Sequence, residues 1–199
     1  MRFIISILIL SIFSIGLGTR SNTSIITIDK GLYVVKYSEI LEQPVMVSYK
    51  VICSHGNASR KGMDFFAEKG IHTSDNADYV GNVWDKGHMA PAASFNCSKD
   101  TLKKVFSYIN CALQHQNLNR GQWRELESFE RELSSTGKNV YVKIDINFRK
   151  DSEVLETGAT VPYSFTKHLI VNGVPQCYSF LNAQGSLNFK EHQINCQSH

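Results

Sequence analysis

The sequence is short of several features that would assign it to a particular class of protein. Its 5 cysteines show no Cys-x-x-Cys spacing, so a structural zinc site is not indicated. No internal repeat or low-complexity stretch is present. The one long apolar run, from Phe3 to Leu17, is shorter than the roughly 20 residues that a membrane span needs. The formal net charge is only +3, so a polyanionic partner would have to be held by a local basic patch.

The composition is that of a globular protein, and the N-terminal residues resemble a signal peptide. The chain has 199 residues, 42% hydrophobic and 20% charged, which suits a single domain with a sizeable core. Met1-Arg2, the apolar run and then Gly16-Leu17-Gly18 are typical of a signal peptide. We therefore expect a signal peptide over residues 1–18, a single domain over residues 19–199, a secreted protein and no stable membrane partner. An uncleaved anchor is the less favoured alternative.

All the cysteines lie beyond this leader, at Cys53, Cys97, Cys111, Cys177 and Cys196. In an oxidising compartment, five cysteines form at most two internal disulfides and leave one over. The pairing does not follow from the sequence.

Hydrophobic periodicity predicts a protein of mixed α and β structure. Val45, Val47, Tyr49 and Val51 alternate with other residues at the period of a strand, and Leu102, Val105, Phe106 and Ile109 have helical spacing after the N-cap candidate Ser98. The predicted strands are 31–37, 44–55, 79–84, 139–146, 167–171 and 176–181, the last two joined across Asn172-Gly173. A second helix is expected to begin near Asn119, and residues 56–78 are expected to form a long loop.

The stretch from Asp85 to Phe95, which reads Asp-Lys-Gly-His-Met-Ala-Pro-Ala-Ala-Ser-Phe, carries the most chemistry. A neutral imidazole at His88 could take a proton from water near neutral pH. The Lys86 ammonium, two residues earlier, would disfavour the imidazolium and keep His88 neutral. Taken alone, the same stretch fits a surface histidine in a turn.

A second block follows it, with Asn110, then Leu118-Asn119, Trp123 and Leu126-Glu127. In order and spacing, the two blocks resemble the DNA/RNA non-specific endonuclease family, in which Asp-Arg-Gly-His-x-Ala-Pro precedes the same pattern. Three positions depart from the family. Lys86 replaces an arginine, Leu113 replaces a proline, and Ile144-Asp145-Ile146 stands where relatives read Thr-Gly-Pro.

The resemblance implies an α+β fold, with a mixed or antiparallel sheet, packed helices and a ββα-metal finger as the active site. It implies a Mg²⁺-dependent endonuclease that hydrolyses phosphodiester bonds of DNA and RNA. His88 would be the general base, Asn119 a direct ligand of one Mg²⁺ (or Mn²⁺), and Glu127 a ligand through a water. Arg60, Lys86 and Asn110 would bind the substrate.

Several alternatives stay open. Asn119 could be a helix N-cap, and Glu127 could be a surface carboxylate. The acidic and basic side chains of the second helix, Glu130 and Arg131 among them, fit an ordinary solvated face. The candidate basic patch could instead be scattered solvated charges (Arg60, Lys61, Lys86, Arg120 and Arg124). At the level of function, the alternatives are a catalytically silent nucleic-acid-binding or interaction protein of the same fold and an unrelated disulfide-stapled interaction domain.

Overall fold

The protein is built on a seven-stranded antiparallel sheet with the strand order β1-β2-β3-β6-β7-β8-β9. The structure is a computed structural model, and it describes residues 25–185 and 188–196. The predicted signal peptide lies outside these ranges. The strands are β1 (Ile25–Asp29), β2 (Tyr33–Ser38), β3 (Gln43–Lys50), β6 (Val140–Asn147), β7 (Ser164–Val171), β8 (Val174–Leu181) and β9 (Gln193–Ile194).

Alternating burial explains why these segments form a sheet with one covered face. In β6, Val140, Val142, Ile144 and Ile146 are buried, and the residues between them are more exposed. The predicted hairpin between β7 and β8 is confirmed. Its two turn residues have φ values of 50° (Asn172) and 86° (Gly173), as a tight two-residue hairpin turn requires.

Between β3 and β6 the chain leaves the sheet to build a finger. The finger consists of the loop 56–78, the antiparallel strands β4 (Trp84–His88) and β5 (Cys111–His115), and the helix α1 (Lys99–Lys104) between them. A strand predicted at 79–84 is wrong, because the chain bends there and the strand begins only at Trp84. The Asp85–His88 part of the motif is therefore itself part of strand β4, and does not follow a strand.

Helix α1 is shorter than predicted. Ser98 is its N-cap and accepts a hydrogen bond from the Thr101 N–H, as expected, but the helix ends at Lys104. Val105, Phe106 and Ile109 are buried but lie beyond the end of α1, and Ile109 belongs to a separate 3₁₀ turn, so their helical spacing reflects burial in the core and not one long helix.

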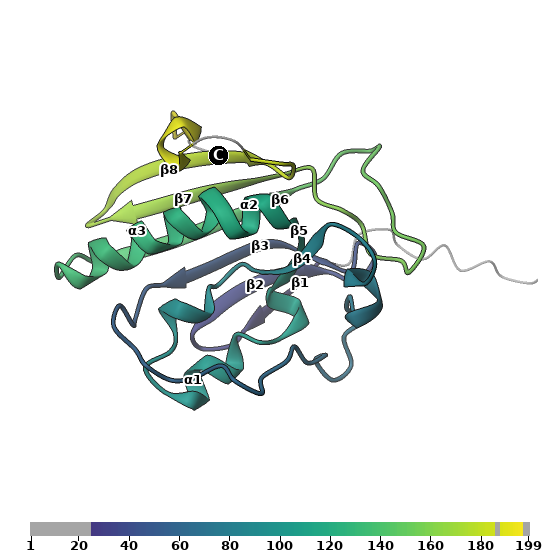
Figure 1. The fold of residues 1–199 in the computed structure, drawn as a ribbon, viewed down its shortest axis with the longest axis horizontal. Coiled ribbons are helices and arrows are strands. Elements are labelled where there is room, and N and C mark those ends of the chain that lie inside the picture. Colours follow the sequence, from purple (N-terminus) through teal and green to yellow (C-terminus); the bar gives the residue numbers. More distant parts are fainter. Residues whose placement is uncertain (1–24, 186–187, 197–199) are drawn as a thin grey trace, which may run out of the picture.

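A helical segment runs from α2 (Gln116–Leu118) through a π-helical turn (Asn119–Trp123) into α3 (Arg124–Ser135), with a kink at Gly121, whose φ of -104° and ψ of -116° are not helical. It begins earlier than predicted, and its N-cap is His115. Figure 1 shows α3 lying along the main sheet, between the strands labelled β7 and β3. Trp123 and Leu126 are buried, and the Trp123 ring lies 5.4 Å from that of Phe165 in β7.

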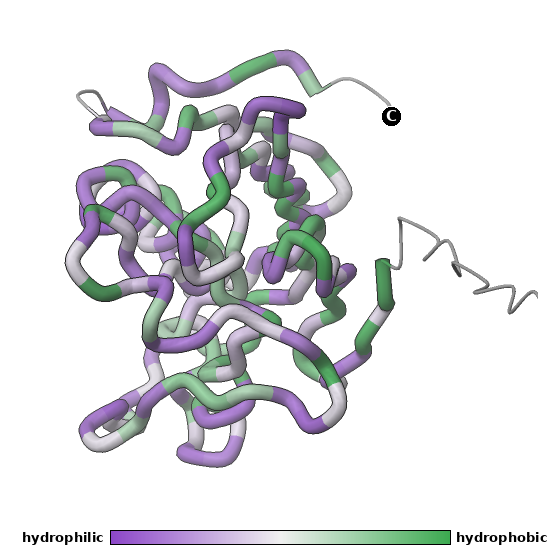
Figure 2. Tube along the Cα trace, turned by 90° about the vertical axis from the view of Figure 1, so that its right-hand side faces the viewer, coloured by the Kyte–Doolittle hydropathy of each residue, from purple (hydrophilic) through white to green (hydrophobic). Residues whose placement is uncertain are grey.

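A single core cluster joins the finger to the sheet. It includes Val35 and Val142 of the sheet, Leu126 of α3 and Met89 and Phe106 of the finger. Figure 2 shows the outer loops to be largely hydrophilic. Short 3₁₀ turns complete the described chain at Asn76–Tyr79, Ala92–Ser94, Tyr108–Asn110 and Phe189–His192. The expected α+β class is confirmed.

Two disulfides join distant segments, Cys53 to Cys97 and Cys177 to Cys196, and Cys111 is a buried free thiol. This agrees with the expected count of two disulfides and one unpaired cysteine. Within the described ranges, no helix has the length and apolar character needed to cross a bilayer.

Candidate active site

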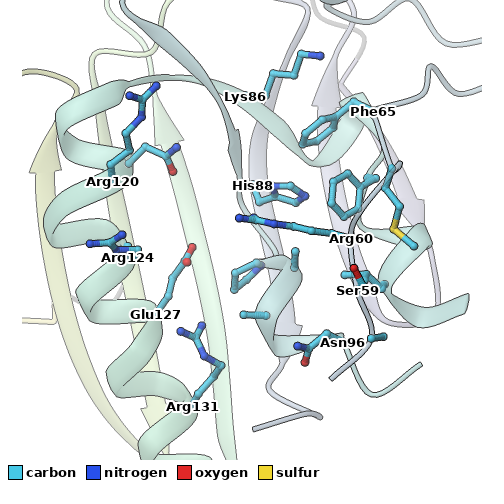
Figure 3. A pocket seen from close by; sticks show the side chains of 18 residues that line it. Ser59, Arg60, Phe65, Lys86, His88, Asn96, Arg120, Arg124, Glu127 and Arg131 are labelled. Atoms are coloured by element: carbon cyan, nitrogen blue, oxygen red, sulfur yellow. The ribbon is translucent and has the colours of Figure 1, made fainter. Parts of the chain in front are cut away.

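A cavity of about 880 Å³ opens between the finger and the α2–α3 helix. Its polar lining consists of Ser59, Arg60, Lys86, His88, Asn96, Asn119, Arg120, Arg124, Glu127 and Arg131. Figure 3 shows Glu127 and Arg131 projecting from α3 toward the side that carries His88 and Arg60. The cavity thus brings together most of the residues that the two sequence blocks contributed.

His88 lies at the end of β4, between two aromatic rings. Its ring is 4.6 Å from that of Phe65 and 4.7 Å from that of Phe106. Its Nε2 atom is covered and has no hydrogen-bond partner among the described residues. A buried polar atom without a partner is uncommon in folded proteins and often has a functional reason.

The surroundings of His88 favour the neutral imidazole. Burial, assisted by the positive charge of Arg60, lowers its pKa from 6.5 to about 3. A charged ring would lose its hydration against two aromatic side chains, which explains why burial is the larger cause. The sequence correctly predicted a neutral His88 but assigned the effect to the Lys86 ammonium, and here Arg60 is the nearby charge that matters.

Asn119 is held in place by the motif strand. Its Nδ2 donates to Asp85 Oδ2 at 2.8 Å, which leaves the amide oxygen as the end available to the cavity. Arg120 also binds Asp85, with Nε to Oδ2 at 2.8 Å and Nη2 to Oδ1 at 2.6 Å. These hydrogen bonds lower the pKa of Asp85 although burial opposes them. The N-cap interpretation of Asn119 is wrong, because His115 caps this helix and Asn119 lies inside it.

Glu127 is one side chain of the cavity wall and is half-buried. Burial raises its pKa from 4.5 to about 7, and the neighbouring Glu130 adds to the rise, while Lys167 and Arg131 oppose it. Its place in the cavity wall distinguishes Glu127 from a fully exposed surface carboxylate. A carboxylate this poorly solvated would gain from a cation in the cavity.

Replacing Glu127 by glutamine should stabilise the metal-free protein at alkaline pH. The pKa of Glu127 is higher in the folded protein than in the unfolded chain, so protonation of this side chain favours folding. That contribution is fully present below pH 4.5 and is lost as pH rises through 7. Glutamine does not ionise, so we expect a gain on the order of 2 kcal/mol at pH 8, reduced from the full shift by partial solvation, and almost none at pH 4. Thermal melts in EDTA at both pH values measure this, and an equal gain at both would contradict it.

Asn110 does not face the cavity, so its predicted contact with substrate is not supported. It is fully buried, its Oδ1 accepts from the Ala90 N–H at 2.8 Å, and its Nδ2 donates to the Ala90 and Val105 carbonyls. Both ends of the amide are occupied by backbone. Asn110 instead fixes the chain just after His88.

Lys86 lies at the rim of the cavity, in Figure 3 above His88 and beside Phe65. Its ammonium donates to Asp64 Oδ1 at 3.0 Å and to Asn76, and it lies over the rings of Phe65 and Tyr108. Asp64 is 69% exposed, and an ion pair with so exposed a partner is worth only about 0–1 kcal/mol. A substrate phosphate could therefore displace Asp64 from Lys86.

Replacing Asp64 by asparagine tests this exchange. We expect the Kd for a phosphate-containing ligand of the cavity to fall roughly 2- to 5-fold, the equivalent of an exposed ion pair, because an ammonium is freed and a negative charge is removed. Lys86→Met should raise this Kd instead. If Lys86 serves only to anchor the loop that carries Arg60, Asp64→Asn would weaken binding as Lys86→Met does.

Arginines dominate the charge of the cavity. Arg60 comes from the loop 56–78, and Arg120, Arg124 and Arg131 come from the helix. Arg131 was predicted to lie on a solvated face, yet it lines the cavity. Arg131 follows Glu127 by one helical turn and therefore lies on the same face of the helix. The prediction that Glu127 belongs to the site could have indicated that Arg131 does too. Lys61, proposed for the basic patch, does not line the cavity.

Comparisons with known proteins relate the chain to a family of nucleases. The chain matches the sequence model described as DNA/RNA non-specific endonuclease over residues 12–197. It is 37% identical over 90 residues to mitochondrial Endonuclease G of Bos taurus, covering 44% of this chain and 30% of that protein. A nuclease of Nostoc is 33% identical over 97 residues, covering 49% of this chain and 35% of that protein. The matched segments thus span about a third of these curated relatives.

The fold comparison covers more of both chains. A chain in the crystal structure of the EndoG/EndoGI complex superimposes with a TM-score of 0.75 and 25% identity, over 85% of this chain and 80% of that one. The likeness therefore includes the main sheet as well as the finger.

Proposed function

Because the chain belongs to the DNA/RNA non-specific endonuclease family, we propose that it hydrolyses internal phosphodiester bonds of DNA and RNA. The observation that carries the proposal is the neutral His88, with its unpartnered Nε2, in a cavity that also holds Asn119, Glu127 and arginines. A base, an oxygen ligand and cationic side chains around one cavity are what phosphodiester hydrolysis requires.

His88 acts as the general base, and it accepts a proton from the water that attacks phosphorus. Arg60 binds a phosphate oxygen. A phosphate bound there neutralises the Arg60 charge, which is one cause of the low pKa of His88. The imidazole consequently becomes more basic when substrate is bound. The bond that breaks is the one between phosphorus and the 3′ oxygen.

The cavity fits one Mg²⁺ or Mn²⁺ ion. Among the described residues, no group of three His, Cys, Asp or Glu side chains gathers as a metal site. Mg²⁺ retains several waters and needs few protein ligands, so the Asn119 amide oxygen and Glu127, acting through a water, suffice. When bound, the ion neutralises charge on the phosphate and on the departing oxygen. Asp85 fixes the amide of Asn119, and the carboxylate of Glu127 is stabilised by a cation.

The protein should cleave DNA and RNA with little sequence preference. The side chains of the cavity are suited to bind phosphate and water, and contacts to phosphate carry no sequence information directly. We expect comparable rates on double-stranded DNA, single-stranded DNA and single-stranded RNA, and binding that weakens with salt as counterions are released. A preference above about 10³-fold, some 4 kcal/mol in the transition state, would contradict non-specific cleavage.

The decisive experiment uses the purified mature chain with plasmid DNA and RNA, in Mg²⁺, Mn²⁺ or EDTA. Fragmentation of both substrates that EDTA abolishes supports the proposal. Binding of both nucleic acids without cleavage under any condition would favour the catalytically silent alternative.

We also propose that the protein is secreted. The N-terminal pattern of residues 1–18 motivates this, and two disulfides are in keeping with an oxidising compartment. Mass determination of the N-terminus after expression with export tests where the leader is removed.

A further inference from the structure

A lysine and a glutamate are completely buried together beneath α3. Lys167 of β7 and Glu130 of α3 are both 0% exposed, and Lys167 Nζ donates to Glu130 Oε1 at 2.8 Å. The same ammonium lies 3.9 Å from the centroid of the Trp123 ring. The other oxygen of Glu130, Oε2, accepts from the Tyr49 hydroxyl of β3 at 2.7 Å. None of these groups has a part in the reaction proposed above.

A buried ion pair is not an efficient way to stabilise a protein core. Removing two charges from water carries a desolvation penalty, and well-packed apolar residues of similar volume are often as stabilising. What the network adds is a fixed orientation of the Glu130 side chain, because each of its carboxylate oxygens is bound by a partner in a defined direction. Burial and the Glu130 charge raise the pKa of Tyr49 well above its ordinary value, so its hydroxyl remains a donor.

The partners of Glu130 control how α3 is rotated about its own axis. Tyr49 and Lys167 belong to β3 and β7, which are separated in the sheet by β6. Glu130 is therefore fixed from two directions at once. Glu127 lies three residues earlier, about 60° away around the helix. A rotation of about 20° would move a side-chain tip about 6 Å from the axis by about 2 Å.

We propose that Lys167, Glu130 and Tyr49 form a rotational lock that positions Glu127, one turn away on α3, toward the cation in the cavity. This inference rests on the proposed function, because it assigns the lock a role in holding that cation. The three are positioning residues and do not touch substrate. Displacements of about 1 Å are enough to impair a catalytic site.

The test removes the whole network and not one partner. Single replacements leave a buried charge alone and risk unfolding, whereas Tyr49→Phe/Glu130→Met/Lys167→Met replaces every polar group by an apolar one of similar size. We expect this triple variant to fold. We expect it to need at least tenfold more Mg²⁺ for half-maximal cleavage and to bind Mn²⁺ at least tenfold more weakly by electron paramagnetic resonance. The control is Val35→Ala, a buried site in β2 that is outside the Tyr49–Glu130–Lys167 network, at a temperature where both variants are folded.

Hydrogen–deuterium exchange supplies a readout that needs neither metal nor nucleic acid. In the triple variant, the amides of α3 should exchange at least tenfold faster while those of β6 and β7 stay protected. Unchanged α3 protection, or wild-type Mn²⁺ binding, would overturn the lock. Faster α3 exchange in a protein whose wild type neither binds Mn²⁺ nor cleaves nucleic acid would refute the proposed function and the metal-positioning role together, and leave only a structural lock.

Discussion

His88→Ala should lower the turnover number by at least about 10²-fold and leave substrate binding nearly unchanged. General-base catalysis contributes about 10²–10⁴-fold, and the arginines that we propose to contact phosphate are intact in this variant. Single-turnover cleavage and filter binding in EDTA measure the two quantities separately.

A matched control is His72→Ala, since His72 is an exposed histidine outside the cavity that pairs with Glu42. It should cleave at the wild-type rate. Near-wild-type cleavage by His88→Ala would mean that another group activates the water, and the assignment of the base would be wrong.

Asn119→Ala should abolish Mg²⁺-dependent cleavage without unfolding the protein. It removes the amide oxygen from a site with few protein ligands. A helix N-cap would lose about 1 kcal/mol of stability on the same change, but His115 caps this helix, so that loss is not expected. Thermal melting and a Mg²⁺ titration of the cleavage rate separate the two effects.

Asp85→Asn is the companion variant, because it keeps the Asn119 oxygen but removes the carboxylate that orients it. Loss of such an outer partner typically weakens metal binding 10- to 100-fold. A graded series, with wild type above Asp85→Asn and Asn119→Ala lowest, is the expected outcome. Equal activity in all three would exclude Asn119 as a ligand.

Local signals in the sequence predicted the parts of the fold that depend on local chemistry. The β7–β8 hairpin followed from Asn172-Gly173, whose residues adopt positive φ readily, and the α1 N-cap followed from Ser98. Strand β1 was missed. It is an edge strand, paired on one side only, and several of its side chains are exposed, so it has no strong pattern of burial.

The parts that depend on distant partners could not be predicted. Glu130 looked like a member of a solvated helix face, and its burial is decided by Lys167, 37 residues away, and Tyr49, 81 residues away. Asn110 matched the family pattern in sequence, but only the fold shows that backbone groups occupy its amide. The position of His88 at the cavity, by contrast, was predictable, because its residue type and its spacing to the second block point to the same place.

The Cys53–Cys97 disulfide should keep the finger covalently connected after a single proteolytic cut. Its two cysteines are 44 residues apart, and the ring they close contains both the loop 56–78 and His88. A protease that cuts once in that loop opens the ring but does not release either piece, because the disulfide still joins them covalently. The nicked protein should therefore run as one species without reductant and as two with it. Arg60 and His88 would stay tethered to the same sheet throughout.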